Sequence, residues 1–511
     1  MIRTYNNFAG GKNSHGVPTI IVDEGQTDAL AYASDSYNWE MSEKGLIKVP
    51  GWEDVITSPA DAVVTGDFEY NGATKKRILC KGTNVYTVAG GVETEVYPLA
   101  GADQTAGAYY QACEWDDGSG VPILILMNGV DKPLVYNGTT CAQATYTDPD
   151  TVWGDARPFA ATVFRGRIFY ITATEVITPI PGTYNDFTDS TGETDRFQVD
   201  AGFGGDITGI LAFTDDILMI YKERCIRRLS GSSPFGATSD PFYLAPVTND
   251  YGCVAPRTLV QIGLEHYFLS AEGIRNLKPY DKYGDIEPLL PTYAIQDEVL
   301  EWNWSDITDA CAAFLQKDNH YYFAVPYGTS SENNKLYTLD VITKGIDPRK
   351  TDDVLVSSLC VYDRAMYHGD YHGQLFEHGS VNSANGSDHE AQWSSKLIAH
   401  YSLGRWKRYN RLCLFAEADG NGDVLVEWQI LAEDQISQET ETATVQATAS
   451  LWDTALWDSA VWNSGSEKIF ATKNLGRGHA IRLRLTNISA EQRPIIRCID
   501  LNVEPLGEVL G

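Results

Sequence analysis

The stretch Tyr367–His378 contains His368, His372 and His378 and is the nearest approach to a metal-ligand cluster in this sequence. Two histidines four residues apart share one face only on a helix. A glycine follows both His368 and His372, which favours a hairpin turn over a helix. The pattern therefore predicts a turn between two strands, and we expect no metal site there.

A second segment, Asp419–Asp423, resembles the opening of a calcium-binding loop because acidic and amide side chains alternate with glycines. However, Val424 stands where an EF-hand loop needs glycine, and Ile430 stands where it needs the bidentate glutamate. A tight turn between two strands explains the segment better.

Motifs of the common catalytic classes do not occur in the chain. Gly10–Lys12 is followed by Asn13 and lacks the spacing of a phosphate-binding loop. No G-x-S-x-G elbow, no H-E-x-x-H pair and no dinucleotide fingerprint is present. The sequence therefore predicts a protein that is not an enzyme, with no catalytic residues and no cofactor.

Basic residues are scarce, so their clustering is informative. The chain of 511 residues carries 39 basic and 69 acidic side chains, a net charge of −30. Two clusters are candidates for docking an acidic neighbour or contacting phosphate: Arg405, Lys407, Arg408 and Arg411, and Lys222, Arg224, Arg227 and Arg228. Solvated strand faces that balance local acids are the alternative for each cluster.

Tryptophan recurs every fifth residue in the segment Leu451–Gly465, at Trp452, Trp457 and Trp462. This spacing fits neither a helix nor a flat strand, so we expect an ordered loop. Its rings would pack either on the adjacent domain or on a neighbouring subunit, since tryptophan is enriched at interface hot spots.

The elements that carry these residues are expected to be strands. Glycine (45), tyrosine (28), phenylalanine (17) and tryptophan (12) give a strand-and-turn composition. Paired apolar runs recur about every 44 to 54 residues from Arg77 to Phe376. This period predicts a β-propeller of six or seven blades. An irregular series of hairpins in a sandwich is the alternative. The segment Tyr293–Trp302 is expected to be a short helix inserted between strands.

The pattern changes after Ala391, where longer alternating strands appear. The residues of Ile481–Leu485 alternate strictly between apolar and charged, which places one face in a core and the other in water. The sequence thus predicts an all-β protein with an irregular N-terminal arm (1–52), a β-propeller (53–390) and a β-sandwich (391–511).

Nine cysteines are scattered singly along the chain, and no C-x-x-C pair occurs. We interpret them as small apolar core residues of a protein in a reducing compartment. The N-terminus has no signal-like apolar region, and no apolar run approaches the length of a membrane span. The sequence therefore predicts a soluble protein made in the cytoplasm.

Several short motifs resemble those of one family of virion proteins. FAGGKN at Phe8–Asn13, QTDA at Gln26–Ala29 and GLIKVPGW at Gly45–Trp52 are similar to the opening of tailed-phage proteins that lead into a propeller. Further motifs lie at Phe164–Phe169, Asp215–Tyr221, Gly252–Ala255 and Ser270–Ile274. Together with the opening, they are similar to motifs of the tail hub or nozzle proteins of short-tailed bacteriophages, including packaged-DNA stabilisation proteins.

The resemblance implies a non-enzymatic ring, expected to be a homohexamer, in the virion tail. Such a ring is assembled in the host cytoplasm, lies below the portal or adaptor protein and meets tail fibre, tailspike or needle proteins. It continues the DNA channel and holds the packaged genome until ejection, while double-stranded DNA passes without sequence specificity. An acidic lumen suits this role because it repels phosphate. A receptor- or glycan-binding propeller protein of the virion is the alternative.

Overall fold

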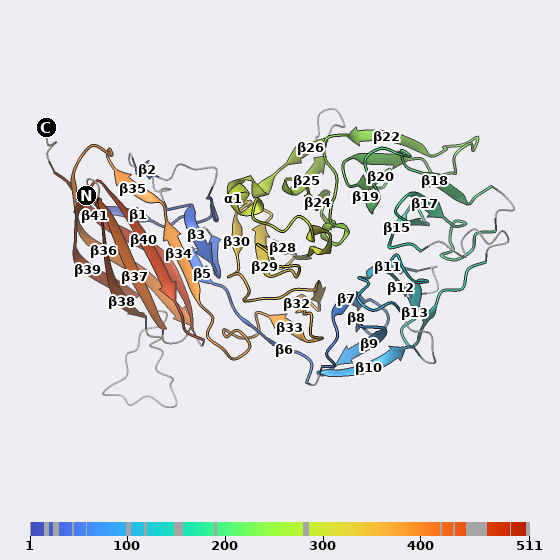
Figure 1. Cartoon of the computed structure of the whole chain (residues 1–511), viewed down its shortest axis with the longest axis horizontal. Helices are drawn as coiled ribbons and strands as arrows, with labels where there is room; N and C mark the ends of the chain where they lie inside the picture. Colours follow the sequence, from blue (N-terminus) through green and yellow to red (C-terminus); the bar gives the residue numbers. More distant parts are fainter. Residues whose placement is uncertain are drawn as a thin grey trace.

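Strands form nearly all of the regular structure, and the fold is all-β (Figure 1). The computed structural model describes residues 2–14, 20–23, 30–42, 45–57, 59–98, 104–116, 120–147, 157–188, 192–279, 286–419, 422–432, 435–445, 468–490 and 492–506. Within these ranges the helical elements are α1 (Gln296–Val299) and the 3-10 turns η1 (Pro256–Thr258), η2 (Pro291–Ile295) and η3 (Ile307–Asp309). The helix expected at Tyr293–Trp302 is therefore present as η2 followed by α1.

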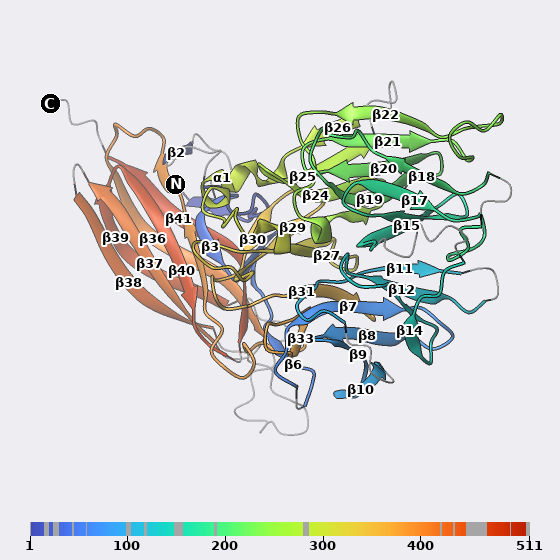
Figure 2. The same cartoon turned by 45° about the vertical axis from the view of Figure 1, so that its right-hand side comes forward.

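Seven four-stranded antiparallel sheets account for the middle of the described chain. Six of them use four consecutive strands, and all seven lie around a common centre in Figures 1 and 2. We call these seven sheets the propeller part.

The first four sheets contain β7 (Val64–Tyr70), β8 (Lys76–Lys81), β9 (Asn84–Ala89) and β10 (Val92–Tyr97); β11 (Gln111–Trp115), β12 (Ile123–Met127), β13 (Leu134–Tyr136) and β14 (Cys141–Gln143); β15 (Ala160–Phe164), β16 (Arg167–Ile171), β17 (Glu175–Thr178) and β18 (Asp195–Gln198); and β19 (Ile207–Thr214), β20 (Ile217–Lys222), β21 (Ile226–Ser230) and β22 (Tyr243–Thr248). The last three contain β23 (Val260–Ile262), β24 (Glu265–Ser270), β25 (Gly273–Pro279) and β26 (Ile286–Leu289); β27 (Cys311–Leu315), β28 (His320–Val325), β29 (Lys335–Asp340) and β30 (Ile346–Pro348); and β31 (Ser358–Tyr362), β32 (Ala365–Gly369), β33 (Leu375–His378) and β6 (Trp52–Asp54).

Apolar clusters join each small sheet to the next. Tyr70 of the first sheet and Leu124 of the second belong to one buried cluster, and equivalent clusters connect every following pair. A final cluster joins Tyr367 of the seventh sheet to Leu79 of the first. Because both faces of the inner strands are covered, whole strands such as β28 are buried.

The seventh sheet takes its outer strand from the beginning of the chain. Strand β6 pairs with β33 in antiparallel register, with Trp52 opposite His378. The sheet that ends the propeller part is therefore completed by a strand that lies just before its first sheet in the sequence. This pairing closes the circle, and it could not be read from local periodicity.

Two larger sheets lie beside the propeller part, at the left of Figure 1, and we call them the paired sheets. The six-stranded sheet contains β39 (Lys468–Gly478), β36 (Lys407–Asp419), β41 (Arg493–Pro505), β5 (Gly45–Lys48), β4 (Trp39–Ser42) and β1 (Ile2–Tyr5). The seven-stranded sheet contains β2 (Ile20–Asp23), β35 (Leu397–His400), β40 (Ala480–Asn487), β34 (Ala391–Ser395), β3 (Ala33–Tyr37), β37 (Gly422–Ala432) and β38 (Gln435–Val445). One cluster of buried residues draws on both sheets.

The expectation of an irregular N-terminal arm was wrong for the described residues of 1–52. Strands β1 and β5 pair with β41, and β3 pairs with β34. Phe8 and Trp39 are fully buried in the common core of the paired sheets. The paired sheets therefore do not consist of residues 391–511 alone, because the polar and glycine-rich start of the chain supplies strands to both.

The segment Asp419–Asp423, expected to be a tight turn between two strands, connects β36 and β37, which do not pair with each other. Strand β36 ends at Asp419 and β37 begins at Gly422, but the first pairs with β39 and β41 and the second with β38 and β40. The segment therefore passes from one of the paired sheets to the other.

Candidate functional site

The histidines singled out in the sequence lie in the seventh sheet. His368 and His378 sit on β32 and β33, and the chain turns between these strands as expected. Nδ1 of His368 and Nε2 of His378 are 2.7 Å apart, whereas His372 lies in the turn, 3.3 Å from a carboxylate oxygen of Asp61. In the part of the chain that the structure describes, no group of three or more His, Cys, Asp or Glu residues could hold a metal ion.

The first basic cluster, Lys222 to Arg228, is divided between interior and surface. Nζ of buried Lys222 donates to three backbone carbonyls, those of Val199 (2.7 Å), Asp200 (3.1 Å) and Phe203 (2.6 Å). Arg227 is buried and forms an ion pair with Asp200. Only Arg224 and Arg228 of this cluster are exposed, so half of the predicted docking charge has a structural use.

The second cluster, Arg405 to Arg411, is divided in the same way. Lys407 is buried, and its Nζ donates to the carbonyls of Ser402 and His479, the latter at 2.6 Å. Burial, and then the charge of Arg405, lowers the pKa of Lys407 to about 8. Arg408 pairs with Glu504 at 3.8 Å, and Arg411 is exposed.

The two basic clusters do not come together in the fold. One lies on β20 and β21 in the propeller part and the other starts β36 in the paired sheets, at opposite ends of Figures 1 and 2. Trp452, Trp457 and Trp462 lie outside the described residues, so the structure does not bear on their proposed packing.

The junction between the propeller part and the paired sheets contains features that the sequence did not indicate. Two chain segments cross it side by side. The Gly51 amide donates to the Val381 carbonyl (2.8 Å), and the Asn385 amide donates to the Trp52 carbonyl (2.8 Å). A Cβ atom on Gly51 would lie 1.7 Å from the Ser383 carbonyl oxygen, so only glycine fits at this approach.

Strand β30 of the propeller part also binds the N-terminal segment directly. The Lys12 amide donates to the Ile346 carbonyl (2.9 Å), and the Asn38 amide donates to the Pro348 carbonyl (3.0 Å). The Asn38 side chain donates to Asp353 at 2.9 Å. These bonds attach the propeller part to segments whose strands belong to the paired sheets.

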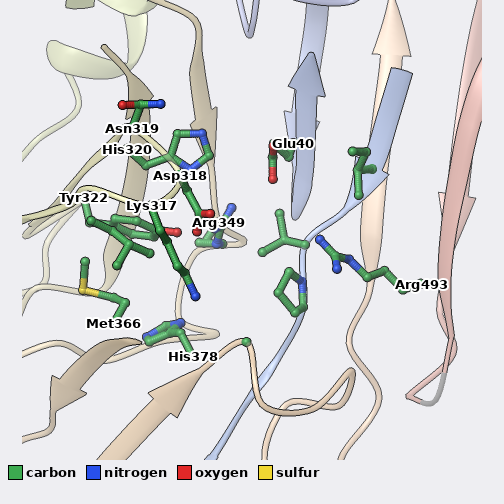
Figure 3. Close-up of a pocket in the computed structure, with 15 residues that line it drawn as sticks. Glu40, Lys317, Asp318, Asn319, His320, Tyr322, Arg349, Met366, His378 and Arg493 are labelled. Carbon is green, nitrogen blue, oxygen red and sulfur yellow. The ribbon is translucent and has the colours of Figure 1, made fainter. Parts of the chain in front are cut away.

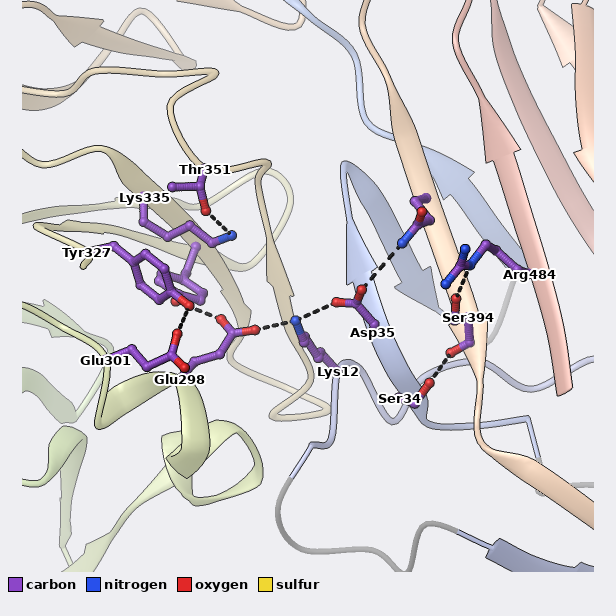
Figure 4. Close-up of polar contacts among 12 residues, drawn as sticks. Lys12, Ser34, Asp35, Glu298, Glu301, Tyr327, Lys335, Thr351, Ser394 and Arg484 are labelled. Carbon is purple, nitrogen blue, oxygen red and sulfur yellow. Dashed lines mark hydrogen bonds and ion pairs between the residues drawn. The ribbon is translucent and has the colours of Figure 1, made fainter. Parts of the chain in front are cut away.

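A polar network centred on Lys12 crosses the same junction (Figure 4). Nζ of Lys12 pairs with Asp35 (2.8 Å) from the paired sheets and with Glu298 from α1. The Tyr337 hydroxyl donates to the other oxygen of Glu298 at 2.8 Å. Burial by itself would lower the pKa of Lys12, but the carboxylates of Glu298 and Asp35 raise it. The ion pairs therefore stabilise a buried charge.

A cavity of about 500 Å³ opens at this junction, between the sixth and seventh small sheets and the paired sheets. Arg349 and Arg493 stand on facing sides of it in Figure 3. The other polar or ionisable lining residues are Glu40, Lys317, Asp318, Asn319, His320, Tyr322 and His378.

Arg349 is the most unusual of these residues. It is only 4% exposed, makes no ion pair with any described residue, and its Nη1 is buried without a hydrogen-bond partner. Asp347, two residues away, is also buried, and its Oδ2 accepts from the Met41 amide at 3.2 Å. Burial raises the pKa of Asp347 well above its usual range, which disfavours the carboxylate that could have balanced Arg349.

No single motif contains the lining of this cavity, which comes from β4, β5 and the residues after it, the β27–β28 turn, the end of β30, β32, β33 and the start of β41. His378 and the segment Gly45–Trp52 were singled out in the sequence for other reasons. A basic residue after a strand, such as Arg349 after β30, looks like an ordinary surface charge until tertiary packing buries it.

The arrangement of the small sheets defines the class of protein as all-β and propeller-like. No family model matches the chain, and no curated protein matches it. Among solved structures it is similar to the extracellular domain of a one-component system from B. thetaiotaomicron, at 10% identity and a TM-score of 0.42, covering 76% of this chain and 46% of that one.

Two further solved structures are similar over most of their own length. BamB from Moraxella catarrhalis matches at 11% identity and a TM-score of 0.32, covering 62% of this chain and 98% of that one. BBS1N, solved in complex with ARL6DN, matches at 9% identity and a TM-score of 0.37, covering 65% of this chain and 99% of that one. Among the described residues, no helix has the length and apolar character needed to cross a membrane.

Proposed function

We propose that this chain is a structural protein of a bacteriophage tail, in which copies form a hub or nozzle ring that continues the DNA channel and helps to retain the packaged genome. In this proposal the small sheets are the blades of a seven-bladed β-propeller and the paired sheets are a β-sandwich. The seven clusters that link neighbouring sheets in a closed circle support the blade number.

The observation that carries the proposal is a net charge of −30 on an all-β chain of two connected parts. Both ends of the chain contribute to the paired sheets, two segments cross the junction, and the buried Lys12 network holds the parts together. Such a body suits a subunit that must keep its shape in an assembly. Its acidity suits a conduit, since DNA carries about one negative charge per 1.7 Å of axis and would be repelled rather than held.

The burial of several basic side chains of the two clusters fits this role. Lys222, Arg227 and Lys407 are used inside the subunit, which leaves few cations to grip a passing duplex. The exposed remainder, Arg224, Arg228 and Arg411, is available for docking an acidic neighbour such as a portal or adaptor protein.

Native mass spectrometry and electron microscopy of the purified chain test the proposal. We expect closed rings, alone or together with a portal–adaptor complex, and an open central channel. A chain that stays monomeric at high concentration and also fails to join a portal–adaptor complex would contradict it.

A receptor- or glycan-binding propeller is the second candidate, and one observation favours it. Phe203, Phe235 and Tyr243 belong to the fourth small sheet and its loops and are 50%, 43% and 65% exposed. Exposed aromatic rings can stack on sugars, and binding of the monomer to a glycan array would support this reading. Loss of that binding in Tyr243→Ala would place the site.

A further inference from the structure

We propose that the cavity between the propeller part and the paired sheets binds a small oxyanion of the phosphate or carboxylate type, and that Arg349 and Arg493 hold it from opposite sides. The site is independent of ring formation. The bound anion would connect the two parts of the chain within one subunit.

The state of Arg349 is the first argument. A guanidinium does not lose its proton in proteins, so Arg349 remains a cation although burial lowers its pKa. A buried cation without a partner is costly, and a charge-paired ligand removes most of that cost. Asp347 and Glu40 favour its charged form, but neither forms an ion pair with it. Asp347 accepts from the Met41 amide and is shifted toward its neutral form.

The facing wall provides the second argument. Nε of Arg493 donates to the Lys48 carbonyl at 2.9 Å, which fixes the guanidinium at the cavity edge. Planar guanidinium groups bind carboxylate and phosphate in a bidentate manner. A cavity of about 500 Å³ has room for such an anion together with water.

The remaining lining residues define the chemistry further. Lys317 adds a third positive charge, whereas Glu40 and Asp318 add two negative charges. The lining residues therefore have a formal net charge of +1, although the whole chain has a net charge of −30. His378 is neutral near pH 7, because burial and then the charge of Arg349 lower its pKa to about 3. A neutral imidazole can donate one hydrogen bond without changing this charge balance. The lining therefore suits a small anion better than a cation.

Thermal unfolding with inorganic phosphate or acetate, at constant ionic strength set with NaCl, tests the proposal. Constant ionic strength matters because phosphate stabilises many proteins without a site. We expect the Tm of the wild type to rise by about 3 °C when the free anion concentration is about 100 times its Kd, and to keep rising with the logarithm of that concentration. Phosphate and acetate identify which oxyanion the site prefers.

Three variants separate a site from a general salt effect. Arg349→Met and Arg493→Met should lose most of the anion-dependent shift, while the exposed control Arg364→Gln, at a position with no proposed binding role, should keep it. Without added anion, Arg349→Met should melt no lower than the wild type, because it removes an unpaired buried charge. Broadening of the ³¹P signal of inorganic phosphate by the wild-type protein gives a test that needs no variant. A wild type with neither an anion-dependent rise in Tm nor ³¹P broadening, or an equal rise in Arg349→Met, would overturn the proposal.

Discussion

His368 and His378 share a hydrogen bond of 2.7 Å inside the seventh small sheet, where His368 is buried and His378 is partly buried. Phe376 stacks on His368 with ring centroids 4.7 Å apart, and Trp52 packs edge-on to it at 6.5 Å. The pair therefore lies in the sheet that joins the two ends of the propeller part. Protonation of either imidazole should therefore weaken the sheet in which β6 pairs with β33.

Acid should destabilise the protein below pH 6.5. Burial lowers the pKa of His378 to about 3 and of His266 to about 4, and lowers that of His368 well below its usual value. In the unfolded chain these histidines bind protons at about pH 6.5, whereas in the folded chain they do so only at lower pH. Their contribution to the free energy of unfolding is therefore complete above pH 6.5 and is lost as the pH falls toward 3. Between pH 6.5 and 5, each histidine should lower the free energy of unfolding by about 2 kcal/mol.

Urea unfolding at a series of pH values checks this expectation. His378→Gln should unfold with a shallower pH dependence than the wild type, whereas the control His372→Gln, at an exposed turn position, should follow the wild-type curve. A wild-type stability that does not change between pH 6.5 and 5 would contradict the buried neutral histidines.

The Lys12 network should couple the two parts of the chain energetically. Lys12→Met leaves the carboxylate of Glu298 buried without its cation, so we expect a loss of about 3 kcal/mol in the free energy of unfolding. The double variant with Glu298→Gln should lose less than the sum of the single variants. Additive losses would show that the two residues do not interact. The exposed pair of Lys75 and Glu69 is the matched control and should contribute little.

Closure of the seventh sheet should depend on Trp52. Its indole is 5% exposed and contacts His389 with ring centroids 5.2 Å apart. Trp52→Ala removes this packing and should cost about 3–5 kcal/mol. Hydrogen exchange should then increase in β33 and β31, at the join, more than in the fourth sheet. Uniform exchange across all small sheets would contradict a closure role for β6.

Deleting residues 1–40 should damage the paired sheets themselves. The deletion removes β1, β2 and β3 and the first two residues of β4, and it takes Phe8 and Leu30 from the common core. We expect faster proteolysis within 391–505 and a lower thermal midpoint for that part. A truncated chain with an unchanged melting profile would show that these strands are dispensable.

Duplex DNA should bind weakly and with a small salt dependence. Each phosphate neutralised adds about 0.9 to the slope of log affinity against log salt, so the second basic cluster without buried Lys407 should give a slope of about 3 at most. Arg408→Glu with Arg411→Glu should lower that slope. Lys407→Met should change stability but not the slope. Tight or salt-resistant binding would be incompatible with a sliding conduit.

The local sequence pattern determined the kind of element in the small sheets and after Ala391, but not in the N-terminal segment. Apolar runs ending at glycine predicted the strand pairs of the small sheets, and the alternation at Ile481–Leu485 predicted a strand with one buried face, which is β40. The turn after His368 and the helix near Gln296 followed from the same short-range signals. Backbone geometry and burial act over a few residues, so sequence alone can reveal them.

Only the tertiary structure decided which strands lie together and which charges are buried. The pairing of β6 with β33 joins residues more than three hundred positions apart, and β1 to β5 join the paired sheets although their sequence looked irregular. The same packing buries Lys222, Lys407 and Arg349, whose side chains look alike in the sequence but have different partners. Long-range pairing depends on complementary surfaces from distant segments. A local sequence pattern therefore does not identify the strand with which a segment pairs.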